Sequence, residues 1–216
     1  MAHTIWPLFD LRVRTARLEL RPATDELLVA VADLAAAGVH DAATMPFLEA
    51  WTDAPPDELR RGTLQWGWRH RAGWAPEAWN LGLAVLLGGE VVGVQDIGAE
   101  QFAKLRTVHT GSWLGRCHQG QGIGTEMRGA VLHLAFAGLG ATVAYSGAWH
   151  DNAPSIAVSR RHGYVDNGER VLLRRGVPDR QLDFRLERSA WEERRRDDVT
   201  IEGLGPCLPL FGADAT

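Results

Sequence analysis

The chain has 216 residues, of which 45% are hydrophobic and 23% are charged, and its formal net charge at pH 7 is −4. These values are typical of a globular protein and argue against a disordered or fibrous chain. Because non-specific binding to nucleic acid depends on a strongly basic surface, the slightly acidic balance also argues against a nucleic-acid binder.

In chain order, the sequence first predicts a strand and two helices. Residues 17–21 alternate between apolar and charged side chains, which is typical of a strand. Thr24 can cap a first helix that ends at Gly38, because apolar residues recur between them at helical spacing. A Pro-Pro pair followed by two acidic residues begins a second helix over residues 55–73.

Tryptophan is concentrated in and after this second helix. Five of the nine tryptophans lie between residues 51 and 79. Because large aromatic side chains dominate both cores and interfaces, the cluster indicates a pocket wall, a subunit contact or ordinary core packing. These tryptophans are Trp51, Trp66, Trp68, Trp74 and Trp79.

The second half of the chain predicts further strands and helices within one domain, residues 1–216. The predicted elements are a hairpin (81–87 and 91–97), a strand (107–114), a helix (122–138), a strand (142–146), a helix (154–162) and an antiparallel pair (169–174 and 182–187). We expect the core to span about residues 17–187, with a C-terminal extension over 189–216. The charged run in that extension indicates a solvated helix end, and residues 203–212 an irregular tail.

The most informative segment is residues 113–127, where a predicted strand enters a glycine-rich loop that opens an amphipathic helix. Glycines let backbone N–H groups approach a phosphate, and a helix N-terminus adds partial positive charge, so the segment predicts an anion site. A P-loop signature is absent, and Gly124 comes one residue too early for a dinucleotide-binding fingerprint. A tight strand–helix turn without a ligand is the structural alternative.

This loop resembles part of the GNAT family of acyl-CoA-dependent N-acyltransferases. The pattern Gln119-x-x-Gly122-x-Gly124 is similar to the family signature (Arg/Gln)-x-x-Gly-x-(Gly/Ala). The predicted order of strands and helices over residues 17–187 is also similar to the family's order, so the resemblance covers most of the chain.

A second segment strengthens the resemblance. The pattern Asn152-x-x-Ser155-x-x-Val158, which a Gly-Tyr pair follows, resembles the signature of the branch that acylates ribosomal-protein N-termini. Residues 6–12 and 209–212 are similar to those of a mycobacterial member of the family described as a succinyltransferase.

The resemblance implies an α/β (α+β) fold whose central mixed, mostly antiparallel sheet is splayed at the CoA site and flanked by helices. It implies acetyl-CoA or succinyl-CoA as co-substrate, with no metal. Loop amides would hold the pyrophosphate, and the preceding strand would hold the pantetheine arm. The implied cofactor-binding residues are Trp113, Leu114, Gln119, Gly120, Gln121, Gly122, Ile123, Gly124, Thr125, Asn152, Ser155 and Arg161.

The resemblance also implies catalytic roles. The backbone N–H near Leu114 would polarise the thioester carbonyl. Ser155 would protonate the leaving thiolate, since neither of the two tyrosines matches the position of the tyrosine that other members use. Asn152 would contact the cofactor and brace the splay, and Arg161 would face the ribose phosphate. The reaction would be direct attack of a neutral amine on the thioester in a ternary complex.

Such a reaction needs a proton acceptor, which the sequence does not single out. Each candidate could equally be a solvated or structural residue, because the assignment of a base depends on geometry. The candidates are His150, Asp151, His109, Asp96 and Glu100. Cys117 belongs to no nucleophile–base motif, and we expect it to be a small buried residue.

The sequence is compatible with more than one function and more than one acceptor. A catalytically silent CoA-binding module is the main alternative to an active enzyme, and a nicotinamide oxidoreductase rests on the glycine loop alone. The acceptor, bound by about residues 24–73, could be a protein N-terminus, a lysine or a small amine.

The sparse cysteines, the absence of a signal peptide and the short apolar runs predict a cytoplasmic protein without membrane contact. We also expect a homodimer.

Overall fold

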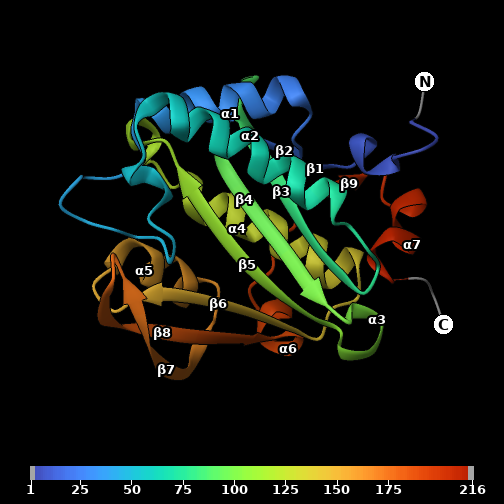
Figure 1. The fold of residues 1–216 in the computed structure, drawn as a ribbon. Coiled ribbons are helices and arrows are strands. Elements are labelled where there is room, and N and C mark those ends of the chain that lie inside the picture. Colours follow the sequence, from blue (N-terminus) through green and yellow to red (C-terminus); the bar gives the residue numbers. More distant parts are fainter. Residues whose placement is uncertain (1–2, 214–216) are drawn as a thin grey trace.

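A single sheet forms the centre of the computed structural model, which describes residues 3–213. In this part of the chain nine strands follow the order β7-β8-β6-β5-β4-β3-β2-β1-β9 (Figure 1). Only β5 and β6 run parallel, so the expected mixed, mostly antiparallel sheet is confirmed. The strands are β1 (Arg12–Arg14), β2 (Leu18–Pro22), β3 (Ala78–Leu87), β4 (Glu90–Glu100), β5 (Thr107–Leu114), β6 (Val143–Trp149), β7 (Val165–Arg174), β8 (Val177–Glu187) and β9 (Thr200–Glu202).

Helices cover both faces of this sheet (Figure 1). Val31 of α1 packs in one apolar cluster with Ala84 and Val94, whereas Val131 of α4 packs in another with Ile97. The α-helices are α1 (Asp25–Ala37), α2 (Pro56–Ala72), α3 (Phe102–Leu105), α4 (Ile123–His133), α5 (Ala153–Arg161), α6 (Arg188–Glu192) and α7 (Leu208–Phe211). Shorter helical turns are η1 (Pro7–Asp10), η2 (Trp51–Asp53), η3 (Arg116–His118), η4 (Leu134–Gly138) and η5 (Gly205–Cys207). Within residues 3–213, every helix is too short or too polar to cross a bilayer.

Local sequence signals account for several of these boundaries. The Thr24 hydroxyl accepts the N–H of Leu27 at 3.5 Å and so caps the start of α1. Proline at the first position of α2 suits a helix start, where its missing N–H has no partner to lose. Gly88 and Gly89, at φ +60° and +89°, form the turn between β3 and β4, because a two-residue hairpin favours positive φ at both positions.

Several elements differ in extent from those that the sequence predicts. The helix expected to reach Gly138 is α-helical only to His133 and then continues as the π-helical turn η4. The short strand expected to end at Ser146 continues as β6 to Trp149. The final antiparallel pair is longer than expected, because β7 and β8 meet across a tight turn at Arg175 and Gly176.

The expectation of an irregular tail over residues 203–212 is wrong, because most of these residues form the turn η5 and the short helix α7. β9 pairs with β1 at the edge of the sheet. The indole N–H of Trp74 donates to the carbonyl of Leu210 at 2.8 Å, and that of Trp79 donates to Phe211 at 3.1 Å. These partners lie more than a hundred positions away in sequence, so local periodicity could not reveal them.

Candidate functional site

The site begins where the two parallel strands separate. β5 and β6 pair only as far as His109 and Tyr145, although β5 continues to Leu114 and β6 to Trp149. The later residues of the two strands therefore face a gap in the sheet. This is the splay that the family resemblance implied beside the pantetheine arm.

Arg128 of α4 joins the two strands beyond the point where their pairing ends. Its guanidinium donates to the hydroxyl of Ser146 on β6 at 3.1 Å and to that of Ser112 on β5 at 3.2 Å. The side chain is buried, and no carboxylate of the described residues forms an ion pair with it. A buried cation without an ion pair thus lies beside the splay, a feature that the helical spacing of α4 did not signal.

The backbone of β5 leaves an N–H group directed at the splay. The N–H of Gly115 donates to the carbonyl of Val92, on the β4 side. Because successive N–H groups of a strand point to opposite sides, the N–H of Leu114 points away from β4 and towards the gap. Its direction suits the expected role of this group in polarising a carbonyl.

The glycine-rich loop has the backbone that an anion site requires. Gly120 and Gly122 adopt φ of +73° and +76°, and a Cβ at Gly120 would meet no atom within 4 Å. The Gln119 side chain donates to the carbonyls of Val39 and Leu114, at 2.7 and 3.0 Å, and so anchors the loop. The Gln121 side chain donates to the carbonyl of Cys117 at 3.1 Å.

The loop, β5 and α5 meet at Gly124, in the first turn of α4. A Cβ built there would lie 3.7 Å from Leu114 Cδ1 and 4.0 Å from Val158 Cγ2. Thr125, the next residue, accepts a hydrogen bond on its carbonyl from His162 Nε2 at 2.9 Å. Burial lowers the pKa of His162 to about 4, so this ring is neutral at pH 7. The two sequence segments singled out by the resemblance are therefore adjacent in space.

Asn152 and Ser155 occupy the start of α5. Asn152 Oδ1 accepts the N–H of Ser155 at 3.2 Å, which makes Asn152 the helix cap. The Ser155 side chain is half-buried and its hydroxyl makes no hydrogen bond to the described residues. Arg161 is exposed at the other end of α5, where the described residues provide it with no ion pair.

The ion pair between Arg17 and Glu126 contacts the glycine-rich loop. Glu126 is buried, and its carboxylate receives hydrogen bonds from Arg17 Nε at 2.7 Å and from the Thr15 hydroxyl at 2.5 Å. Burial opposes ionisation, yet these hydrogen bonds hold the pKa of Glu126 below its usual value. Arg17 also donates to the carbonyl of Gln121, at 3.4 Å, so the pair ties the residue before β2 to the loop.

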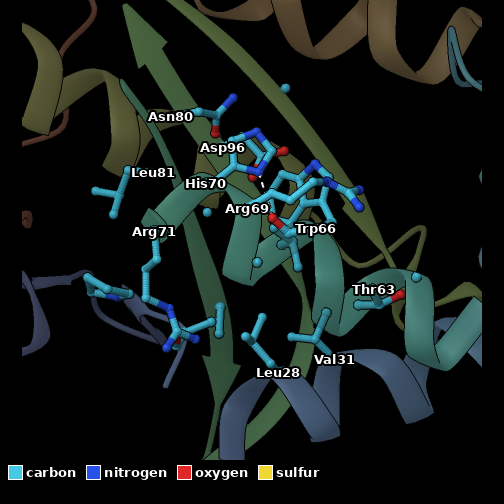
Figure 2. A pocket seen from close by; sticks show the side chains of 18 of the residues that line it. Leu28, Val31, Thr63, Trp66, Arg69, His70, Arg71, Asn80, Leu81 and Asp96 are labelled. Carbon is cyan, nitrogen blue, oxygen red and sulfur yellow. Dashed lines mark hydrogen bonds between the residues drawn. The ribbon is translucent and has the colours of Figure 1, made fainter. Parts of the chain in front are cut away.

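A cavity of about 520 Å³ lies between the sheet and the helices α1 and α2, and it extends to Trp113 on β5. Figure 2 shows side chains of α1 (Leu28, Val31) and α2 (Thr63, Trp66) around the same space as Asp96. Seven tryptophan and phenylalanine side chains line this cavity: Trp6, Phe9, Phe47, Trp51, Trp66, Trp74 and Trp113.

The cavity decides between the interpretations of the tryptophan cluster. Trp51, Trp66 and Trp74 form part of its wall, so the prediction of a pocket is confirmed for these three. Trp79 is a core residue, and Trp68 is exposed and donates its N–H to Asp25. The segment that was expected to bind the acceptor, about residues 24–73, supplies part of the cavity wall, and strands β3, β4 and β5 supply much of the rest.

Asp96 is the one candidate base among the five that lines this cavity. It lies on β4 opposite Gly82 of β3 and Gly111 of β5, so the flanking positions carry no side chain. A Cβ at Gly82 would come within 3.3 Å of Asp96 Oδ1 and within 2.9 Å of the Trp66 ring. Burial raises the pKa of Asp96 to about 7, although the charge of Arg128 opposes this rise.

The other four candidates lie outside the cavity and are exposed. Two of them have partners of their own: His150 Nδ1 lies 3.2 Å from an Asp179 oxygen, and Asp151 pairs with Arg174 at 2.9 Å.

The prediction for Cys117 is wrong, because this thiol is exposed. It follows Arg116 in a short 3-10 turn at the surface, where no apolar element covers it.

Comparisons with known proteins agree with this geometry. A family model described as "Acetyltransferase (GNAT) domain" matches residues 17–165. Mycobacterium smegmatis RimJ, solved with CoA-disulfide, has a TM-score of 0.65 at 19% identity, over 94% of this chain and 95% of that one. RimL, a ribosomal L7/L12 alpha-N-protein acetyltransferase solved with coenzyme A, has a TM-score of 0.64 at 20% identity, over 80% and 95%.

A third solved structure is an acetyl transferase of Salmonella typhimurium that modifies the N-terminal serine of the 50S ribosomal subunit protein L7/L12. Its TM-score is 0.62 at 21% identity, and the match covers 80% of this chain and 96% of that one. At identities this low, the three likenesses are likenesses of fold.

Proposed function

Because the chain belongs to the GNAT acetyltransferase family, we propose that it is an active enzyme that transfers an acyl group from an acyl-CoA to a primary amine. The observation that carries this proposal is the position of Asp96. Its carboxyl lines a cavity that reaches Trp113, on the strand that borders the splay. An acceptor site and a donor site are thus joined at β5.

The residues at the splay fit an acyl-CoA. The open backbone of Gly120 and Gly122, at the start of α4, can present N–H groups to a pyrophosphate. The N–H of Leu114 can stabilise negative charge that develops on the thioester oxygen. The CoA thioester supplies the acyl group, and the chain's own residues bind it, orient it and move protons.

Proton transfers are assigned to two side chains. Asp96, with a pKa of about 7, accepts the proton that the ammonium of the acceptor loses before or during attack. The Ser155 hydroxyl donates a proton to the leaving thiolate and regains one from the attacking nitrogen, which loses its second proton as it becomes the amide nitrogen. Asp96 then releases its proton to solvent. The nitrogen–carbon bond forms as the carbon–sulfur bond breaks, so free CoA and an amide are the products.

Donor and acceptor define the finer part of the proposal. A succinyl donor carries a carboxylate, which requires a cation near the acyl group. Arg128 supplies a cation beside the splay, so succinyl-CoA and acetyl-CoA both belong in the test. The acceptor classes are a protein N-terminus, the kind modified by two of the structural neighbours, a lysine side chain and a small amine.

The test is the release of free thiol from each acyl-CoA in the presence of pooled amines and N-terminal peptides. We expect turnover with one donor, and a loss of turnover in Asp96→Asn with CoA binding retained. Saturable CoA binding without thiol release would favour the silent CoA-binding module. A protein that binds NAD and fails to bind CoA would favour the oxidoreductase and overturn the proposal.

A further inference from the structure

We infer that the acceptor is a small primary amine with a flat apolar body, such as an arylalkylamine, bound in the cavity beneath α1 and α2. This inference rests on the proposed function, because it names the substrate class of the same site. Three features of the cavity support it: unmatched buried side-chain acceptors in one place, aromatic walls elsewhere, and no further unmatched buried side-chain acceptor among the described residues of the lining.

The unmatched polar atoms belong to Asp96 and Asn80, which both line the cavity. Asp96 Oδ1 and Asn80 Oδ1 are buried without a hydrogen-bond partner in the protein. Gly82 pairs with Asp96, and Asn80 precedes Gly82 by two residues, so both side chains project from the same face of the sheet. Buried acceptors without partners are costly, and an ammonium or amine group offers the donors that would satisfy them.

The walls around this polar pair are aromatic. The Trp66 ring lies against the bare backbone of Gly82, since a Cβ there would approach the ring to 2.9 Å. Towards β5, the ring centroids of Trp51 and Trp113 lie 5.7 Å apart, and the ring centroid of Phe47 lies 5.0 Å from that of Trp51. Aromatic walls favour a flat apolar body, and a cavity of about 520 Å³ has the size of a small-molecule site.

A peptide acceptor fits these walls less well. Each residue of a bound peptide brings a backbone N–H and a carbonyl that need partners when buried, whereas the unmatched acceptors of this cavity are gathered at Asn80 and Asp96. A polyamine would require an acidic cleft. Here the exposed Glu49 and Glu58 share the lining with Arg69 and Arg71, so Asp96 is the one lining carboxyl that no lining arginine offsets.

A matched pair of variants on α2 separates cavity binding from effects on the fold. Gly62 lines the cavity, and a Cβ there meets no atom within 4 Å, so Gly62→Phe can place a ring in the cavity without a backbone clash. Gln65 is exposed on the same helix and lies outside the lining, so Gln65→Phe adds the same ring to the surface. CoA binding, measured by calorimetry, should be unchanged in both.

The experiment measures thiol release and calorimetric binding with 2-phenylethylamine and tryptamine, with spermidine, and with a serine-initiated peptide. We expect the arylalkylamines to be acylated, with KM raised about tenfold or more in Gly62→Phe, equivalent to at least 1.4 kcal/mol, and unchanged in Gln65→Phe. Asn80→Ala should also raise KM for these amines about tenfold or more, since it removes an acceptor for a charged donor.

Each remaining outcome has a defined meaning. Turnover of the peptide or of spermidine without turnover of the arylalkylamines would overturn the inference and leave the proposed function intact. An unchanged KM for arylalkylamines in Gly62→Phe would also overturn it. Arylalkylamine binding that Gly62→Phe abolishes, without thiol release from either acyl-CoA, would support the ligand class and contradict the proposed function.

Discussion

Asp96 and Arg128 are coupled across the central sheet. Burial raises the pKa of the Asp96 carboxyl to about 7, and the positive charge of Arg128 limits this rise. Asp96 faces the cavity beneath α1 and α2, whereas Arg128 reaches β5 and β6 from α4. Burial and the charge of Arg128 therefore together set the pH at which the proposed base is ionised, without a direct ion pair that would hold the carboxylate permanently charged.

Replacement of Asp96 by Asn should lower kcat by about 10²- to 10⁴-fold, the usual contribution of a general base. Since only the ionised carboxylate accepts a proton, the wild-type rate should rise with pH through about 7, and this limb should be absent from the variant. Steady-state kinetics between about pH 5.5 and about pH 9 measure both effects. An unchanged pH profile in Asp96→Asn would exclude Asp96 as the base.

Arg128→Met should shift the rising limb of the pH–rate profile to higher pH. Removal of the cation leaves burial unopposed, so the pKa of Asp96 should rise further. Arg128→Lys is the matched control, because it retains a positive charge but loses the planar contact to both serines. If the two variants shift the profile equally, Arg128 affects the pKa of Asp96 through packing rather than through its charge.

Ser155→Ala should lower kcat more than it changes KM for the amine, because its hydroxyl is assigned to the leaving thiolate rather than to the acceptor. Ser159→Ala is the matched control on the same helix. Its hydroxyl is buried without a partner, so its removal should leave kcat unchanged and should not lower stability. Thiol-release kinetics of the two variants, side by side, test the assignment; equal kcat values would refute it.

Arg17→Ala should destabilise the protein by about 1–3 kcal/mol at pH 7, because it leaves the buried carboxylate of Glu126 without its closest cation. The pKa of Glu126 is held below its usual value in the folded state, so its stabilising contribution is present above the unfolded pKa and is lost as pH falls through the folded one. The difference from wild type should therefore shrink in acid.

Urea unfolding at pH 7 and at pH 4 measures this prediction for Arg17→Ala (expected difference largest at the higher pH). Arg61→Ala provides the control, because Arg61 is exposed on α2 and forms no ion pair among the described residues. Its unfolding free energy should stay within about 0.5 kcal/mol of wild type. A loss of stability in Arg17→Ala that is equal at both pH values would mean that Glu126 does not carry the effect.

Much of the donor side could be predicted from sequence because its signals are local. The positive φ of Gly120 and Gly122, and the cap that Asn152 provides, depend on residues within a few positions of each other. The β3–β4 hairpin follows likewise from its two turn glycines. Local backbone preferences and short-range hydrogen bonds thus determined where the loop, the caps and most elements lie.

The acceptor side was decided by tertiary structure. Nothing in the sequence distinguishes Asp96 from the four other candidate bases. The structure does so, because it places Gly82 and Gly111 beside Asp96 on the neighbouring strands and the Trp66 ring of α2 against Gly82. The same holds for β9, whose partner β1 lies at the other end of the chain. Burial, and with it the raised pKa of Asp96, is a property of neighbours distant in sequence. The sequence by itself determined the family and the glycine-rich loop proposed for the donor. The fold selected the proposed base and shaped the cavity proposed for the acceptor, because desolvation and cavity shape exist only when distant segments pack together.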